Sequence, residues 1–319
     1  MIDLSLSEDQ RQLVDSVTRM LADRAPLLRS RAGASIADVH SDLAKLGWFG
    51  VGIAERRGGL GLGYAEEALL FFEAGRFLLP PSVLATTLAA HLCPEADLPG
   101  LLDGGTRAAL AIVARTGTFV FDRGDAQLLL ALEGDRIWLA PANTYAGDVI
   151  AGFDETLVTE RGAIDGAACI TRAGGGRARL LTSAMLAGIA RASTDLAVDH
   201  ASRRVQFGQP IGAFQAIKHI CADMGLRAYA AEAQIRMAAA LADHDAGGAS
   251  HQIDATALTA LVSARRNAED AIQVHGGIGF TAECDAHLYL KRAHLLGRAI
   301  GGLEACRHGT LARPASGGL

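Results

Sequence analysis

Apolar residues recur every three or four positions near the start of the chain, which is the spacing of one face of a helix. That face consists of Leu13, Val14, Val17, Met20 and Leu21. Residues 7–10, Ser-Glu-Asp-Gln, have the form of a capping box, in which a serine and a residue three positions later satisfy each other's free backbone N–H groups. The pattern predicts an amphipathic first helix that ends before Pro26.

A second helix is expected from about Ile36 to Leu46, and a third from about Tyr64. Between them lies the glycine-rich segment 58–63, Gly-Gly-Leu-Gly-Leu-Gly. A Gly-x-Gly pattern can bind phosphate after a strand, but no clear strand precedes this one. We therefore interpret the segment as a tight turn between helices.

The pattern changes between about Gly104 and Arg172, where short apolar runs alternate with Gly, Asp and Glu turns. These runs predict a small β domain of fewer than seventy residues. The expected strands are Ala109–Ala114, Thr118–Phe121, Gln127–Leu132 and Arg136–Ala140.

Beyond residue 180 the helical pattern returns in four long stretches with short connections, which is typical of an antiparallel four-helix bundle. The stretches are Leu180–Arg204, Ala216–Ala242, Ser250–Val274 and Ala286–Leu303. The fold class expected is thus mainly α, with an N-terminal helical domain (1–103), a small truncated β domain (104–172) and a C-terminal helical bundle (173–319).

The composition argues against nucleic-acid-binding, disulfide-rich and membrane-spanning proteins. The net charge of −5 argues against a nucleic-acid partner. The five cysteines are scattered and suggest free thiols in a reducing compartment, not a disulfide framework or a metal site. The longest apolar run, Leu78–Leu92, is split by two prolines and is too short to span a bilayer. These features lead us to expect a cytoplasmic protein without membrane insertion.

Two short segments carry candidate binding chemistry. Arg204 stands near a helix end before a turn at 208–212, where a guanidinium can grip a pyrophosphate with two parallel hydrogen bonds. Gln273 closes a helix before Gly276 and Gly277, and glycines let a backbone approach a ligand closely. Taken singly, each segment has an ordinary alternative: a surface charge near a helix C-terminus, and a helix C-cap.

Together the two segments resemble the FAD-binding signature of the acyl-CoA dehydrogenase family in order, spacing and residue type. The segments are Arg204-x-Gln-Phe-Gly with Ile211-x-x-Phe-Gln, and Gln273-x-x-Gly-Gly-x-Gly-Phe. The likeness extends to Leu46-Gly-Trp and to the glycine-rich turn at 58–61.

The resemblance implies a tetrameric flavoprotein that oxidises the Cα–Cβ bond of an acyl-CoA thioester. In that family a glutamate removes the α-proton while the β-hydride moves to the flavin. It also implies that this chain binds the pyrophosphate and adenosine end of an FAD held mainly by a neighbouring subunit. The matching cofactor-binding positions are Arg204, Gln206, Phe207, Ile211, Phe214, Gln215, Gln273, Gly276 and Gly277.

The chain departs from the family's pattern where the chemistry is done. Ile300 stands where the family places its catalytic glutamate, and Ala178 stands at the alternative position before Arg179. An alkyl side chain cannot accept a proton. The β domain also lacks the loop and strand motifs that surround the flavin ring in the family, and Trp138 is better explained as a core residue. No catalytic and no metal-binding residue is therefore expected.

The hypothesis is a base-less subunit that completes the FAD site of a second acyl-CoA dehydrogenase-like subunit, in an α2β2 complex whose acyl-CoA lies mainly in the partner's site. By resemblance such complexes belong to actinobacterial steroid degradation. Two alternatives stay open. One is a self-sufficient dehydrogenase with a displaced base, either Glu304, expected one helical turn beyond Ile300, or a residue of the β domain. The other is a flavin-free acyl-CoA-binding or scaffold protein.

Overall fold

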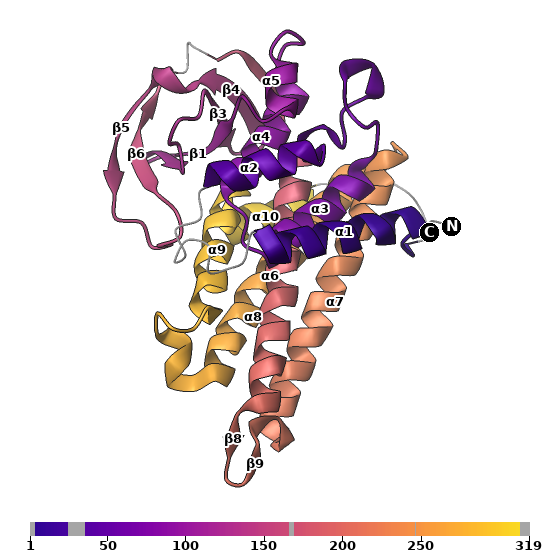
Figure 1. Ribbon diagram of the computed structural model, residues 1–319, viewed down its shortest axis with the longest axis vertical. Helices are drawn as coiled ribbons and strands as arrows, with labels where there is room; N and C mark the ends of the chain where they lie inside the picture. Colours follow the sequence, from indigo (N-terminus) through magenta and orange to yellow (C-terminus); the bar gives the residue numbers. More distant parts are fainter. Residues whose placement is uncertain (1–3, 25–35, 166–168, 246, 313–319) are drawn as a thin grey trace. The chain divides into compact units, whose positions relative to one another are not determined.

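The computed structural model describes residues 4–24, 36–165, 169–245 and 247–312 (Figure 1). The expected stop of the first helix at Pro26 lies outside these residues. The chain divides into two compact units. The first unit combines Met1–Val17, Ala68–Leu78 and Thr182–Leu319, and the second combines Thr18–Glu67 with Leu79–Leu181. Each unit is therefore assembled from segments that are distant in sequence. Three of the boundaries between the units fall within helices.

The N-terminal helices follow the hydrophobic pattern. They are α1 (Glu8–Arg24), α2 (Ile36–Lys45), α3 (Tyr64–Arg76), α4 (Pro81–Leu92) and α5 (Leu98–Leu102). The capping box is formed, since Ser7 N donates to Gln10 Oε1 and Gln10 N donates to Ser7 Oγ, both at 3.1 Å. The segment before α3 is a turn as predicted, with positive φ at Gly58 and Gly61.

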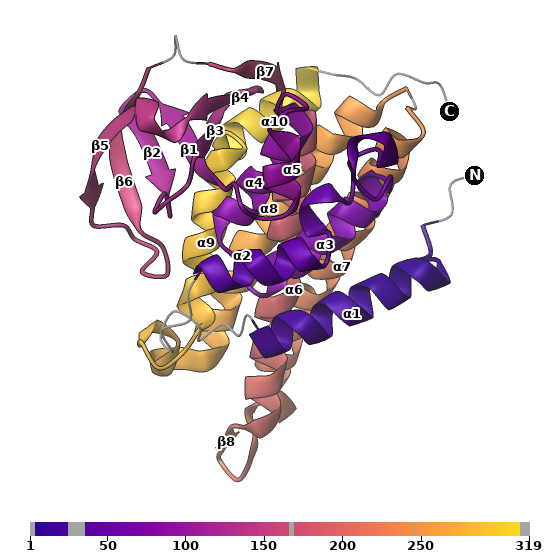
Figure 2. The same cartoon turned by 45° about the horizontal axis from the view of Figure 1, so that its top comes forward.

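A seven-stranded mixed sheet forms the β part of the second unit (Figure 2). Its strands are β1 (Ala108–Ala114), β2 (Gly117–Phe121), β3 (Leu128–Glu133), β4 (Arg136–Pro141), β5 (Tyr145–Ile150), β6 (Thr159–Ile164) and β7 (Thr171–Gly174). They are ordered β5-β6-β2-β1-β3-β4-β7. The central pair β1–β3 is parallel, and the other neighbours are antiparallel.

The four expected strands are present, but β5, β6 and β7 were not predicted. Four of the six residues of β5 are exposed, so the strand has no alternating apolar face to reveal it. In β6, Gly162 lies so close to β5 that an added Cβ would stand 2.0 Å from Ala146 O. The pairing of β5 with β6 therefore depends on close approach of the two backbones, and an apolar side-chain pattern does not mark it in the sequence.

Trp138 is buried in the sheet's core cluster, as expected of a core tryptophan. The described helices include none that is long and apolar enough to cross a bilayer.

The first unit contains the long C-terminal helices. They are α6 (Gly176–Arg203), α7 (Gln215–Asp243), α8 (Ala249–His275), α9 (Ala286–Ala299) and α10 (Gly302–Ala312). α6 also packs closely on α3, because Gly188 has no side chain and an added Cβ there would lie 2.0 Å from Phe72 O. Asn267 of α8 ties three helices together: its Nδ2 donates to Ala190 O of α6 and Met224 O of α7 at 3.1 and 2.9 Å.

The fourth predicted helix, Ala286–Leu303, is wrong as a single element. Gly301 and Gly302 both have positive φ, 88° and 79°, so the chain leaves α9 at Ile300 and starts α10 in a new direction. Glycine adopts this left-handed backbone without steric cost. The expected placement of Glu304 one turn beyond Ile300 on the same helix is therefore also wrong.

His40 of α2 gives the second unit a pH-dependent stability. Burial, with a smaller contribution from the charge of Arg107, lowers the pKa of His40 from 6.5 to about 4. The unfolded chain therefore binds a proton that the folded chain resists. Stability is retained above pH 6.5 and is lost as the pH falls toward 4. We expect unfolding in urea to require roughly 2 kcal/mol less at pH 5 than at pH 7.5 from this residue.

The variant His40→Gln isolates this effect, because its amide can still bond the Ser82 hydroxyl, which lies 3.0 Å from His40 Nε2. Urea titrations of both proteins at the two pH values measure the difference. An unchanged pH slope in the variant would contradict the assignment to His40.

Candidate functional site

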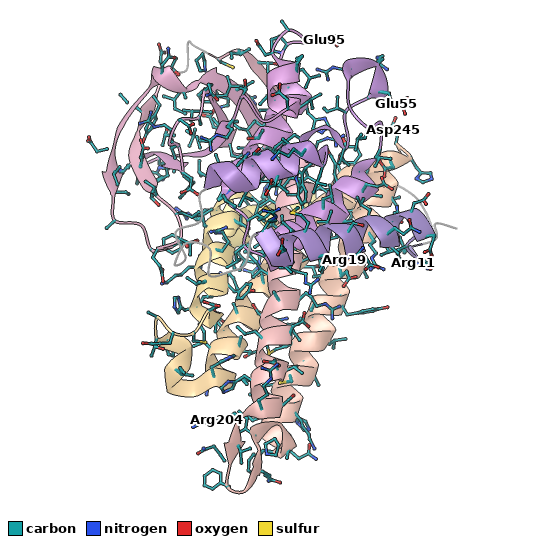
Figure 3. All side chains as sticks on the ribbon, in the orientation of Figure 1. Arg11, Arg19, Glu55, Glu95, Arg204 and Asp245 are labelled. Atoms are coloured by element: carbon teal, nitrogen blue, oxygen red, sulfur yellow. The ribbon has the colours of Figure 1, made fainter. Side chains whose placement is uncertain are left out.

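The Arg204 segment is a hairpin that connects α6 to α7 (Figure 1). α6 ends at Arg203, and Val205–Gln206 (β8) pairs antiparallel with Gln209–Pro210 (β9). The two turn residues, Phe207 and Gly208, have φ of 52° and 81°. Positive φ at both central residues is the backbone geometry of a tight two-residue hairpin turn. Figure 3 shows the labelled Arg204 at the base of this hairpin.

Phe207 is exposed by 93% and occupies a left-handed backbone conformation. Both properties are unfavourable for a phenylalanine in an isolated chain, because bulky L-residues are strained there and an aromatic ring gains by burial. Its ring meets the Phe214 ring edge-on, with centroids 6.2 Å apart. An exposed aromatic on a strained turn indicates a contact with something outside this chain.

The Arg204 side chain makes no hydrogen bond or ion pair with the residues described. Its neighbour Arg203 pairs with Asp199 at 2.6 Å. The amide of Gln206 donates to Val205 O at 2.7 Å, while Gln215, the first residue of α7, is exposed. Arg204 thus presents an uncompensated guanidinium that can receive an anion.

The Gln273 segment lies at the C-terminus of α8. Gln273 is exposed, and Gly276 begins the 3-10 turn η7 (Gly276–Phe280) with φ 66° and ψ −143°, a backbone nearly restricted to glycine. Gly277 has no positive φ, and an added Cβ there would meet no atom within 4 Å. This chain's own packing therefore does not require glycine at 277, whereas a closely approaching ligand would.

The two segments meet at one end of the helical unit. Ile211, just after the hairpin, packs against a core cluster that contains Ala201 of α6 with Ile272 and Val274 of α8. The imidazoles of His200 and His275 stack with ring centroids 4.1 Å apart. His200 lies four residues before Arg204, and His275 directly precedes Gly276. All nine predicted cofactor-binding residues belong to these two segments.

Neither His200 nor His275 was assigned a binding role from the sequence. The stack joins positions 75 residues apart, so only the fold reveals it. Burial, then the neighbouring His275 and Arg204, lowers the pKa of His200, against the opposing charge of Asp199.

The residues at the family's base positions are buried alkyl groups. Ile300 is exposed by 3% and Ala178, in the first turn of α6, by 4%. Glu304 has a side chain exposed by 86%, and its carboxylate accepts a hydrogen bond from Arg307 Nη1 at 3.0 Å. The nearest acid in sequence to Ile300 on its C-terminal side is therefore a surface residue.

The protein-family models match the chain at both ends. The acyl-CoA dehydrogenase N-terminal domain matches residues 7–96, and the acyl-CoA dehydrogenase C-terminal domain matches residues 165–314. The acyl-CoA dehydrogenase IpdE2 of Mycolicibacterium smegmatis is 33% identical over 268 residues, which is 78% of each chain. The chain belongs to the acyl-CoA dehydrogenase family. The mainly helical fold class predicted from the sequence pattern is confirmed.

Two further comparisons define this relationship. The acyl-CoA dehydrogenase FadE34 of Mycobacterium tuberculosis is 36% identical over 83% of this chain, but the match spans only 40% of FadE34. Among solved structures, the Tcur3481-Tcur3483 steroid ACAD G363A variant has a TM-score of 0.81 at 23% identity, covering 97% of this chain and 98% of that one. The ChsE4-ChsE5 complex from Mycobacterium tuberculosis has a TM-score of 0.81 at 18% identity, with full coverage of both chains. At these identities the structures show a shared fold.

Acyl-CoA dehydrogenases bind FAD, and the described residues fit one end of such a ligand. Arg204 is an unpaired cation, Gly277 leaves room for close approach, and Phe207 offers an exposed ring. These groups suit an anionic, partly aromatic ligand. No acidic residue lies within residues 204–215 or 273–280 to repel a pyrophosphate.

Proposed function

We propose that this chain is the non-catalytic subunit of an FAD-dependent, heteromeric acyl-CoA dehydrogenase. Arg204, Gln206, Phe207, Ile211, Phe214 and Gln215 would hold the pyrophosphate and adenosine end of FAD together with Gln273, Gly276 and Gly277. A second acyl-CoA dehydrogenase-like subunit would surround the flavin ring, bind the acyl-CoA and supply the catalytic glutamate. When bound, FAD accepts the hydride from Cβ of the acyl group.

This proposal rests on a contrast between residues that suit FAD binding, which the chain has, and a catalytic base at the family's positions, which it lacks. The Arg204 guanidinium has no hydrogen-bond or ion-pair partner among the described residues, and Phe207 is 93% exposed on a left-handed turn. The described packing does not require glycine at 277. All three residues suit a ligand outside the chain. At Ile300 and Ala178, by contrast, the chain offers only buried alkyl groups. A chain that keeps cofactor contacts and lacks a base can serve catalysis only through a partner.

The exposure of the hairpin supports sharing of the cofactor. Residues 202–210 are all exposed, so a ligand bound there would be covered on one side only. Ligand sites usually bury most of the ligand surface. A second subunit is therefore expected to complete the cover, and the assembly proposed is α2β2, by resemblance to the tetramers of the family.

The substrate proposed is a bulky acyl-CoA, such as a steroid-derived thioester. The support is the likeness to the Tcur3481-Tcur3483 steroid ACAD and to the two-component ChsE4-ChsE5 complex. This part rests on analogy of fold.

The alternative with Glu304 as a displaced base is tested in the assembled complex. We expect Glu304→Gln to leave kcat within twofold of wild type, because this carboxylate is paired with Arg307 at the surface. Removing a true general base lowers the rate by about 10²–10⁴-fold. Steady-state kinetics with an acyl-CoA and a dye acceptor measure the effect. A loss of that size would favour a self-sufficient enzyme over the proposal.

A further inference from the structure

The His200–His275 stack lies between the two proposed cofactor-binding segments. Its rings are 4.1 Å apart and inclined by 27°. His275 Nδ1 lies 2.7 Å from Ala271 O, a carbonyl that can only accept, so Nδ1 carries a proton and Nε2 is the open nitrogen. The ring nitrogens of His200 make no hydrogen bond with the residues described. The stack therefore has imidazole nitrogens available beside Arg204 and Gly276.

The charges around the stack oppose protonation in the free chain. Arg204 and the second imidazole both disfavour a cation at His200, and Asp199, which favours it, is paired with Arg203. The hairpin and η7 contribute no ionisable side chain between 205 and 210 or between 276 and 280. From α7, Lys218 and His219 are the nearest in sequence, and both are exposed. No carboxylate other than Asp199 among these groups offsets the positive charge.

An anion at Arg204 would reverse this balance. A pyrophosphate neutralises the guanidinium and adds negative charge, and nearby negative charge favours the protonated form of an imidazole. A protonated imidazole is in turn a donor that can bond the anion. Only one ring of the stack is expected to become charged, because two imidazolium ions in contact repel each other.

We propose that the His200–His275 stack is part of the anion-binding face, and that binding of the FAD pyrophosphate is coupled to the uptake of one proton from solvent, which converts the His200 imidazole to imidazolium. This inference rests on the proposed function and extends it to a cofactor affinity that depends on pH. It also assigns a binding role to His200, which precedes the first segment, and to His275, which stands at an unspecified position of the second.

The test is the Kd of FAD for the co-assembled complex, measured by flavin fluorescence between pH 8 and 6. Uptake of one proton predicts binding that tightens as the pH falls, by at most about tenfold per pH unit. His200→Phe keeps an aromatic ring in the stack without a titratable nitrogen, and we expect its Kd to vary by less than twofold over the same range.

His244→Phe is the matched control. His244 makes the same bond to the carbonyl four residues earlier, 2.7 Å from Ala240 O, but lies at the far end of α7, whose 29 residues span roughly 40 Å. This variant should keep the wild-type pH dependence. If the His200→Phe complex also keeps it, the inference is wrong.

Other outcomes separate the inference from the proposed function. FAD binding by the wild-type complex with no pH dependence would overturn the inference and leave the function intact. No FAD binding at any pH would overturn both.

A second measurement, on the chain alone, does not depend on assembly of the complex. The pKa of His200 is followed by NMR of the imidazole C–H signals. His275→Phe should raise this pKa, because the variant removes the ring whose charge opposes protonation of His200. An unchanged pKa would show that the rings do not interact.

Discussion

Arg204→Ala is expected to weaken FAD binding to the assembled complex by about 10–100-fold, since a hydrogen bond to a charged group contributes about 1.5–3 kcal/mol. Assembly itself should not change, because the exposed Arg204 side chain makes no hydrogen bond or ion pair with the residues described that would be lost. FAD content after gel filtration and the Kd from flavin fluorescence are the measurements.

Arg203→Ala is the matched control for this prediction. The two arginines are adjacent, but Arg203 is already paired with Asp199 at 2.6 Å on an exposed helix surface. Exposed ion pairs contribute little, so this variant should retain FAD within twofold. Equal flavin content in the two variants would show that Arg204 does not bind the cofactor.

Glu67→Gln is expected to destabilise the second unit by about 3 kcal/mol, because removing one member of a buried ion pair leaves its partner uncompensated. The Glu67 side chain is exposed by only 2% and accepts from His91 Nε2 at 2.7 Å and from Arg177 Nη1. The Arg177 guanidinium also lies 3.7 Å from the centre of the Tyr64 ring. One carboxylate thus connects α3, α4 and the start of α6.

This carboxylate also gives a second pH dependence. Burial raises the pKa of Glu67, but the hydrogen bond from His91 and the charge of Arg177 outweigh it, so the pKa is lowered from 4.5. Stability from this group is present above pH 4.5 and is lost as the pH falls below it.

Urea unfolding at pH 7 compares Glu67→Gln with Glu95→Gln, which removes an exposed partner of Arg57 at 3.1 Å. The second variant should cost less than about 1 kcal/mol. Similar losses in the two variants would show that the buried cluster is not a special source of stability.

The sequence predicted the long helices well, because their apolar positions recur over many turns. α7 and α8 begin and end within one residue of the expected limits, and β1 to β4 follow the apolar runs. The break after Ile300 was missed, although the pair Gly301-Gly302 was a signal for it. The edge strand β5 could not be found by pattern, since its exposed residues carry no alternation.

Part of the candidate site was accessible from sequence and part was not. Family spacing identified Arg204, Gln273 and Gly276, but the left-handed backbone of Phe207 and its exposure depend on the hairpin geometry. The contact of His200 with His275 depends on the packing of α6 against α8. The two histidines are far apart in the chain and share no motif, so their contact is seen only in the folded structure.

The most direct test of the shared-site proposal is the visible spectrum and native mass of this protein, purified alone and after co-expression with a neighbouring acyl-CoA dehydrogenase-like gene. We predict that the protein is colourless when purified alone. After co-expression, we predict a yellow hetero-oligomer with about one FAD per pair of unlike subunits. Full flavin occupancy in a homo-oligomer of this chain alone, with oxidation of an acyl-CoA, would contradict the shared-site proposal.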